Sequence, residues 1–262
     1  MNTENIFAVI LAAGKGKRMN SSLPKVAHLL LNKPLIIWVL ESITKLGINK
    51  IVPVISPEQN LVKELIEKSN ITPKPEVFIS FQTEQKGTAH AVQCGINEIE
   101  RLFLNIWQKS IPIDLKVLVA YGDTPCVKSS TFENLIIKHQ IEKNDFTVLA
   151  FQSKNPFGYG RVVVDSNNEF DCIREQKDCS SEEEKISLCN SGILCANFRQ
   201  LSTILPLIEN HNSANEFYLT DVPYVGKKMG LKIGLSIEPD ENQFLGINTQ
   251  EQLKQIEDIV RK

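Results

Sequence analysis

Short apolar runs alternate with amphipathic segments along the first half of the chain. The apolar runs are typical of buried strands and cover residues 6–11, 50–55, 77–80, 115–121 and 146–152. The amphipathic segments between them predict helices over residues 35–46, 57–68, 88–103 and 130–140. This alternation predicts βαβ units, and therefore a Rossmann-like, doubly wound α/β fold whose mainly parallel sheet is covered on both faces. Ligands of such folds bind beyond the carboxyl ends of the strands.

The pattern changes beyond Gly160. Residues 161–165 and 169–173 alternate in polarity, and we expect them to form hairpins over the mouth of the sheet. The acidic run at residues 181–185 between them is expected to be a solvated loop. Residues 249–261 place Leu253, Ile256, Ile259 and Val260 at helical spacing, which predicts an amphipathic helix.

Composition narrows the class of protein. With 262 residues and 42% hydrophobic content the chain can bury a full core, and a net charge of −2 argues against nucleic acid and anionic membranes as partners. Residues 1–5 lack the features of a secretory signal, and no apolar run is long enough to cross a bilayer, so we expect a cytoplasmic protein. The 6 cysteines contain no Cys-x-x-Cys pair and the 4 histidines are scattered, which predicts reduced thiols and no zinc site.

A glycine-rich loop follows the first predicted strand. It reads Leu11-Ala12-Ala13-Gly14-Lys15-Gly16-Lys17-Arg18-Met19 and is followed by Leu23-Pro24-Lys25. Glycines allow a tight turn whose N–H groups face an anion, and Arg18 and Lys25 can close on the same charge. The spacing fits neither the Walker phosphate loop nor the dinucleotide fingerprint, whose third glycine is replaced by Met19. A bare Gly-x-Gly is also compatible with a solvated turn.

The longer pattern Leu-x-Ala-Gly-x-Gly-x-Arg-Met, with Pro-Lys shortly after, resembles the signature of the sugar-nucleotide pyrophosphorylases. Within that superfamily the chain is most similar to the uridyltransferase domain of the bifunctional N-acetylglucosamine-1-phosphate uridyltransferases. Further matching segments occur in the expected order at residues 82–91 (QTEQKGTAHA), 121–125 (YGDTP), 158–161 (GYGR), 175–178 (EQKD), 190–193 (NSGI), 215–221 (NEFYLTD) and 246–248 (GIN).

The resemblance implies a domain organisation. A nucleotidyltransferase domain of the nucleotide-diphospho-sugar transferase type would cover residues 1–248, with the nucleotide-binding part at about 1–155 and a small β-rich sugar-binding lobe at about 156–248. Residues 249–262 would form a C-terminal helix. Bifunctional members continue into a left-handed β-helix of hexapeptide repeats, which carries the acetyltransferase and forms trimers. Because this sequence has no such repeat, we expect no acetyltransferase activity and a monomer or weak homodimer.

The resemblance also implies a reaction in which a sugar 1-phosphate attacks the α-phosphorus of a nucleoside triphosphate. Repulsion between anions opposes this reaction, so we expect catalysis by positioning, cationic clamps and Mg²⁺. The family's metal ligands fall on Asp123 and Asn248, whose oxygens suit Mg²⁺. Arg18, Lys25 and Asp123 are the predicted catalytic residues, the two cations being assigned to the triphosphate and the developing charge.

Two further groups of residues are carried over from the family. The predicted nucleotide-binding residues are Leu11, Ala12, Ala13, Gly14, Lys25, Gln82, Gly87, Thr88, Tyr121, Gly122 and Asp123. Among them, Gln82 can pair with a donor and an acceptor on a pyrimidine edge. The predicted sugar-binding residues are Gly160, Glu175, Asn190, Tyr218 and Thr220.

The implied activity is synthesis of UDP-N-acetylglucosamine, a precursor of bacterial envelope polymers such as peptidoglycan and lipopolysaccharide, from UTP and N-acetylglucosamine 1-phosphate. Two alternatives stay open: a pyrophosphorylase for another sugar 1-phosphate or nucleotide, and a regulatory subunit that binds nucleotide sugars without turnover. The chain departs from the family at Lys17, where threonine or serine is usual, at Ala89, where glycine is common, and at Asn242-Gln243, where an acidic residue often occurs.

Overall fold

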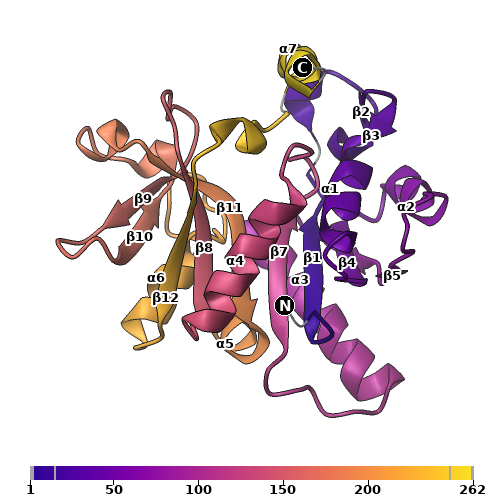
Figure 1. Ribbon diagram of the computed structural model, residues 1–262, viewed down its shortest axis with the longest axis horizontal. Coiled ribbons are helices and arrows are strands. Elements are labelled where there is room, and N and C mark those ends of the chain that lie inside the picture. The colour runs from indigo at the N-terminus through magenta and orange to yellow at the C-terminus, as the bar shows by residue number, and fades with distance from the viewer. Residues whose placement is uncertain (1–2, 15, 248, 261–262) are drawn as a thin grey trace.

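A computed structural model describes residues 3–14, 16–247 and 249–260 of the chain (Figure 1). Its centre is a ten-stranded sheet with the order β10-β9-β11-β7-β1-β4-β5, in which β8 pairs with β11, β12 pairs with β8, and β6 pairs with β4. The strands are β1 (Ile6–Leu11), β4 (Lys50–Ile55), β5 (Glu76–Val77), β6 (Ser80–Phe81), β7 (Lys116–Tyr121), β8 (Phe146–Gln152), β9 (Arg161–Val164), β10 (Phe170–Arg174), β11 (Leu188–Asn197) and β12 (Ile233–Glu238). Strands from before and after residue 156 therefore share one sheet.

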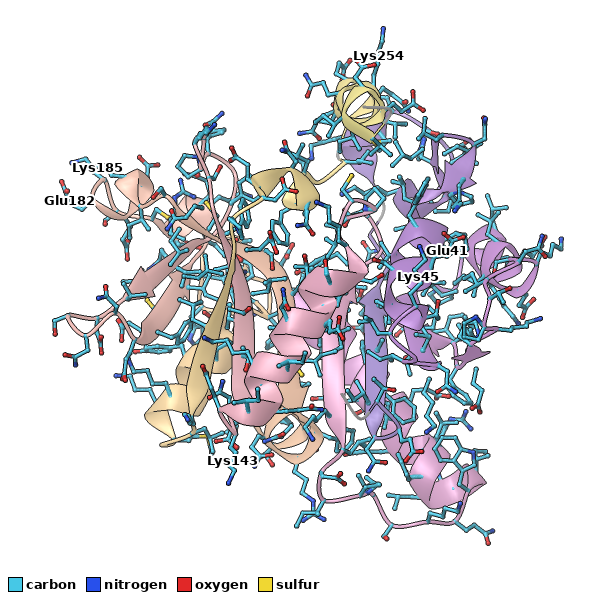
Figure 2. The ribbon with its side chains drawn as sticks, viewed as in Figure 1. Glu41, Lys45, Lys143, Glu182, Lys185 and Lys254 are labelled. Atoms are coloured by element: carbon cyan, nitrogen blue, oxygen red, sulfur yellow. The ribbon has the colours of Figure 1, made fainter. Side chains whose placement is uncertain are left out.

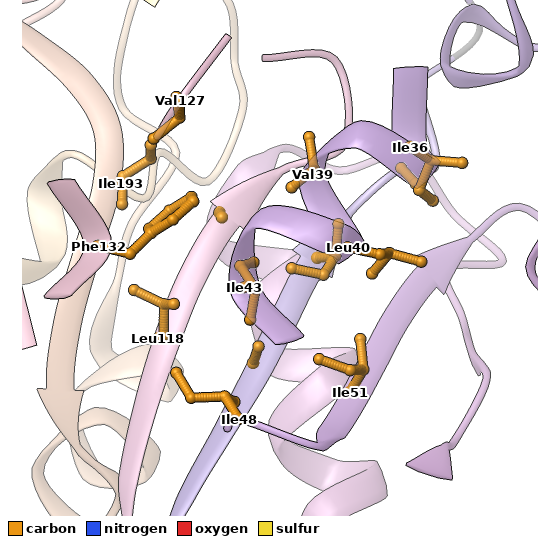
Figure 3. Packing of buried hydrophobic residues seen from close by; sticks show 14 of the residues in the cluster. Ile36, Val39, Leu40, Ile43, Ile48, Ile51, Leu118, Val127, Phe132 and Ile193 are labelled. Atoms are coloured by element: carbon orange, nitrogen blue, oxygen red, sulfur yellow. The ribbon is translucent and has the colours of Figure 1, made fainter. Parts of the chain in front are cut away.

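Helices cover both faces of the sheet. They are α1 (Leu35–Thr44), α2 (Asn60–Glu67), α3 (Thr88–Arg101), α4 (Ser129–Ile141), α5 (Phe198–Ile204), α6 (Asp221–Lys228) and α7 (Gln250–Val260). The alternate residues Ile6, Ala8 and Ile10 of β1 pack with α1, α2 and α4 on one face, and Figure 3 shows part of this core around Ile43 and Phe132. Phe7 and Val9 point the other way and pack with α3 and α5. Both faces of the central strands are thus dry, which explains their continuous apolar runs.

The sequence closely predicted the strands and helices in the first half of the chain. β1, β4 and β8 have the predicted bounds, and α1, α3 and α4 lie within a few residues of theirs. The strand expected at residues 77–80 is instead two short bridges, β5 and β6, which both pair with β4. The predicted C-terminal helix is present as α7. The α/β fold with a mostly parallel, doubly covered sheet is therefore confirmed.

The second half differs from the sequence expectation in one respect. β9 and β10 form the predicted antiparallel hairpin, but it extends the edge of the sheet beside β11 instead of lying over the sheet's mouth. β11 is antiparallel to both β7 and β8, so the sheet is mixed. The acidic run is an exposed loop as predicted, with Glu182 and Lys185 paired at the periphery (Figure 2).

The structure can be compared with two expectations drawn from composition, one about the cysteines and one about membrane-spanning segments. All six cysteines are free thiols, as the sequence predicted. Within the described ranges, no helix combines the length and the apolarity that crossing a membrane would require.

His139 on α4 makes stability depend on pH. Its side chain is 1% exposed, with Nδ1 3.0 Å from Thr147 Oγ1 and Nε2 3.2 Å from Asn197 Oδ1. Burial lowers the pKa of His139 to about 4 from its usual 6.5. The folded state therefore prefers the neutral ring, so stability is fully present above about pH 6.5 and is lost as pH falls toward 4, by about 3 kcal/mol in total. In urea unfolding at pH 7, 5.5 and 4.5, we expect His139→Gln to lose less stability with acid than the parent; equal losses would contradict the assignment.

Candidate active site

The loops that follow β1 and β7 lie side by side at the carboxyl ends of these parallel strands. Leu11 and Tyr121 are the last paired residues, and Gly122 N donates to Leu11 O at 2.9 Å. A cleft of about 290 Å³ opens here, as expected for a doubly wound sheet. Its walls are formed by Leu11, Ala12, Ala13, Gly14, Lys25, Val26, Gln82, Gln85, Gly87, Thr88, Ala91, Tyr121, Asp123 and Glu216.

The cleft brings together all the predicted nucleotide-binding residues except Gly122. Gly122 lies just behind the wall, where a Cβ atom would come 3.1 Å from Val26 Cγ1. Sequence reasoning did not single out Gln85 and Glu216, although both lie within the quoted segments. Gln85 Nε2 donates to Ala13 O at 2.8 Å and so ties the segment that carries Gln82 to the glycine-rich loop.

Lys25 and Asp123 form an ion pair inside the cleft. Their side chains are only 14% and 17% exposed, so the contact is largely shielded from water. Gly16, at φ 58°, lies directly beneath Lys25: a Cβ atom on Gly16 would come 2.8 Å from Lys25 Cβ. The glycine turn therefore makes room for the lysine, a role that the phosphate-loop interpretation of the sequence did not include.

Arg18 is more exposed to solvent than Lys25. It lies on the exposed side of the single 3-10 turn Lys17–Met19, next to Met19, which is buried. The second predicted metal ligand, Asn248, lies outside the described residues. Its neighbour Ile247 is fully buried.

Gln82 forms one wall of the cleft. Its side chain is 5% exposed, and its Nε2 donates to Gly87 O at 3.0 Å and lies 3.3 Å from His90 Nδ1. Because Nε2 donates to the Gly87 carbonyl, Oε1 is the atom that can accept a hydrogen bond from a ligand. Within the described ranges, no protein group donates a hydrogen bond to Gln82 Oε1.

Gly87 joins this wall to the segment that carries the predicted sugar-binding residues. Phe217 N donates to Lys86 O at 2.8 Å, and Ala89 N donates to Phe217 O at 2.9 Å. Thr88 Oγ1 accepts a hydrogen bond from Leu219 N at 2.9 Å. Residues 86–89 and 217–219 therefore form one connected piece of backbone.

We expect Gly87→Ala to destabilise the protein and weaken nucleotide binding. Gly87 has φ 118°, and a Cβ atom there would lie 2.5 Å from Phe217 O, so alanine adds a backbone clash to the conformational strain. The strain alone costs about 1–3 kcal/mol. Gly158→Ala is the matched control, because φ is 91° but nothing lies within 4 Å of the added Cβ. Thermal unfolding and UTP titration should show a clearly larger loss for Gly87→Ala; equal losses would contradict the close approach.

Tyr121 connects the cleft to the predicted sugar-binding residues. Its ring packs on Gly192, where a Cβ atom would come 2.4 Å from Cε2. A second, much smaller cavity of about 10 Å³ is lined by Tyr121 together with Asn190, Gly192 and Thr220. Burial and the nearby carboxylates of Glu175 and Asp123 raise the pKa of the Tyr121 hydroxyl, so it is protonated and can donate at neutral pH.

Four of the five predicted sugar-binding residues are hydrogen-bonded in pairs beyond Tyr121. Asn190 N donates to Gly160 O at 2.8 Å, and Thr220 Oγ1 donates to Glu175 Oε1 at 3.0 Å. Burial raises the pKa of Glu175, and the nearby carboxylates of Asp221, Asp178 and Glu216 add to the rise. Burial also raises the pKa of the Tyr218 hydroxyl, and the Glu175 carboxylate contributes to the rise.

The cleft contains an oxygen donor of the kind that Mg²⁺ prefers. The described residues contain no group of three or more His, Cys, Asp or Glu side chains that could hold a metal. Asp123 supplies one hard oxygen donor at the cleft wall. Such a donor fits Mg²⁺, which commonly binds through one or two protein oxygens while substrate phosphates and water complete its shell.

A doubly wound sheet with a cation and a carboxylate at its carboxyl edge defines an α/β domain of the nucleotide-transferring class. The chain belongs to the MobA-like NTP transferase domain family, whose sequence model matches residues 8–183. This confirms the resemblance to nucleotidyltransferases that the motifs predicted.

Curated relatives cover the chain almost completely. The Bifunctional protein GlmU of Clostridioides difficile (strain 630) is 36% identical over 258 residues, which are 98% of this chain and 52% of that protein. The protein of the same name from Clostridium botulinum (strain Eklund 17B / Type B) is 38% identical over 254 residues, with coverage of 97% and 52%. The chain thus spans about half the length of the curated relatives it matches.

A solved structure shows the same fold. It is the crystal structure of a Bacillus anthracis protein assigned as a glucose-1-phosphate thymidylyltransferase, in complex with a sucrose. The TM-score is 0.74 at 17% identity, with 98% of this chain and 96% of that chain covered.

Proposed function

We propose that this domain transfers the uridylyl group of UTP to N-acetylglucosamine 1-phosphate, giving UDP-N-acetylglucosamine and pyrophosphate. The observation that carries the proposal is the single cleft that holds a charged pair, Lys25 and Asp123, together with a base-reading wall at Gln82 and Gly87. The half-length similarity to bifunctional GlmU proteins supports the same reaction.

Gln82 and Gly87 support uridine as the nucleoside. Gln82 Oε1 can accept from the N3–H of uracil, whereas cytosine has an acceptor at N3 and would face Oε1 unfavourably. Gly87 has no side chain, so a base edge can approach its backbone closely. Near the cleft, Asn190 offers an amide group and Glu175 offers a carboxyl group. Such groups can hydrogen-bond to hydroxyls, which supports a hydroxyl-rich acceptor.

The chain's own residues supply positioning and charge. A phosphate oxygen of the sugar 1-phosphate attacks the α-phosphorus of UTP, and the bond to pyrophosphate breaks on the opposite side. We expect Lys25, which pairs with Asp123 in the cleft, to contact the α-phosphate and Arg18 to contact the leaving phosphates. Mg²⁺ held by Asp123 and Asn248 would neutralise phosphate charge. Tyr121 is a hydroxyl donor on the proposed sugar side, whereas Thr220 Oγ1 donates its hydrogen to Glu175 and can accept a hydrogen bond there.

Release of pyrophosphate tests this proposal. We expect Mg²⁺-dependent release with UTP and N-acetylglucosamine 1-phosphate, and much slower release when CTP, TTP or GTP, or glucose or N-acetylgalactosamine 1-phosphate, replaces either partner. Fast turnover with another pair would identify a different pyrophosphorylase. UTP binding by calorimetry without turnover for any pair would instead indicate a regulatory subunit and contradict the proposal.

A further inference from the structure

A small apolar cluster lies apart from the two cores that pack the faces of the sheet. Its buried members are Met19, Leu30, Leu35, Ile247 and Ile256, with Cys126, Trp38, Leu245 and Leu253 packed against them. We call this set the α7 cluster. It joins segments from the beginning, the middle and the end of the chain.

Members of the α7 cluster are close chain neighbours of the residues proposed to act in catalysis. Met19 follows Arg18, and Ile247 precedes Asn248. Cys126 lies three residues after Asp123. A shift of this cluster would therefore move the backbone that carries Arg18 and Asp123.

α7 contributes the outer side of the cluster. Ile256 is 2% exposed and Leu253 is half-buried, whereas Ile259 and Val260 on the same helix are exposed. Leu31 N donates to Glu257 Oε1 at 3.3 Å, which fixes the helix beside β2 (Leu29–Leu30). Figure 1 shows α7 at the margin of the molecule, and Lys254 points from it into solvent (Figure 2).

The packing of α7 is open on one side. A cavity of about 550 Å³ lies between α7, α1 and the start of α4, and it is lined by Leu30, Trp38, Cys126, Ile259 and Val260 among others. Ile256 is buried within the α7 cluster, so shortening it would leave a gap that the surrounding side chains fill only in part. The positions of Met19 and Ile247 therefore depend strongly on Ile256.

We propose that α7 is a positioning element of the active site. Leu253 and Ile256 pack in one cluster with Met19, Cys126 and Ile247, and this packing holds the turn that carries Arg18 relative to Asp123. The inference rests on the proposed function for the roles of Arg18 and Asp123. Misplacement of reacting groups by about 1 Å can cost about a hundredfold in rate, so a distant apolar contact can matter to catalysis.

The test compares two identical substitutions on one helix. Ile256→Ala removes a contact of the α7 cluster, while Ile259→Ala removes the same atoms from an exposed position. We expect Ile256→Ala to lower kcat about tenfold, with KM for UTP within about twofold, and Ile259→Ala to stay within about twofold for both. Ile256→Leu, which keeps the volume, should restore most of the rate.

Two readouts do not depend on turnover. Amide hydrogen exchange in Ile256→Ala should rise in residues 16–20 and stay unchanged in β8 and β12. Electron paramagnetic resonance titration of Mn²⁺ with UTP present should show a half-saturating concentration about fivefold higher than in Ile259→Ala. Ile256→Val, which removes one methyl group, gives the same comparison if the alanine variant does not fold.

The proposal fails if folded Ile256→Ala, or Ile256→Val in its place, matches Ile259→Ala in kcat, in Mn²⁺ titration and in exchange of residues 16–20. A uniform rise of exchange across the sheet would also overturn it, since that would indicate general destabilisation. If the unaltered protein releases no pyrophosphate with any substrate pair, the proposed function fails, and the exchange and Mn²⁺ measurements still decide whether α7 positions the loop.

Discussion

Asp123→Ala is expected to lower kcat for pyrophosphate release by about a thousandfold. Such a loss corresponds to about 4 kcal/mol of transition-state stabilisation, which is within the range for removing metal-assisted charge neutralisation. Asp123 is the acidic side chain paired with Lys25 in the cleft, so its removal also frees the lysine from its resting position. Steady-state kinetics over a range of Mg²⁺ concentrations measures both effects.

Two further variants define what the carboxylate contributes. Asp123→Asn keeps an oxygen donor but loses the charge, and we expect it to need far more Mg²⁺. Asp171→Ala is the matched control, because Asp171 on β10 also pairs with a lysine, Lys227 on α6, at 3.0 Å, but outside the cleft. Its rate should stay within about threefold. A near-normal rate for Asp123→Ala at limiting Mg²⁺ would show that the metal assignment is wrong.

Lys25→Ala and Arg18→Ala are each expected to lower kcat at least about a hundredfold, while UTP binding weakens much less. A charge-assisted contact made chiefly in the transition state is worth about 3 to 4 kcal/mol, which appears in turnover more than in ground-state binding. Calorimetry with UTP and steady-state kinetics separate the two quantities. Lys25→Arg should also be slow, because a planar guanidinium does not reproduce the compact contact of the ammonium group with Asp123 inside the shielded cleft.

Lys17→Thr is the control for the clamp. It introduces the residue that is usual at this position in the family, and we expect nearly unchanged turnover. If Lys17 proves indispensable and Arg18 dispensable, the loop is oriented differently from the family signature, and the assignment of its cations fails.

The first half of the fold could be predicted because the apolar runs in its sequence are also the strands that are buried in the folded protein. β1 is buried on both faces, so its residues read as one apolar run, and the glycines that follow mark the turn. The position of the cleft followed from strand order alone, since parallel strands end at one edge.

β11 could not be predicted in the same way. Its pairing with β8 shifts register between Asn190 and Leu194, and Gly192 within it has φ 80°. The strand therefore lacks the regular alternation by which strands are recognised, although it is the element that joins the two halves of the sheet.

Sequence reasoning missed one short-range contact in the candidate site, that of Gly16 with Lys25. The packing of Tyr121 on Gly192, and the α7 cluster that contains both Met19 and Ile256, instead join segments far apart in the chain. Nothing in the local sequence of either partner indicates such a contact. The family motifs supplied the residue identities, and only the fold shows which of them touch.

The backbone connection between residues 86–89 and 217–219 has a thermodynamic consequence. In the proposed function the first of these segments faces the base and the second faces the sugar. Because the two segments are hydrogen-bonded to each other, an occupant that orders one of them lowers the entropy still to be lost by the other. Such linkage is reciprocal, so the factor by which a bound nucleotide raises the affinity for sugar phosphate equals the factor in the opposite direction. The two substrates would then bind as a cooperative pair, although each contacts different side chains.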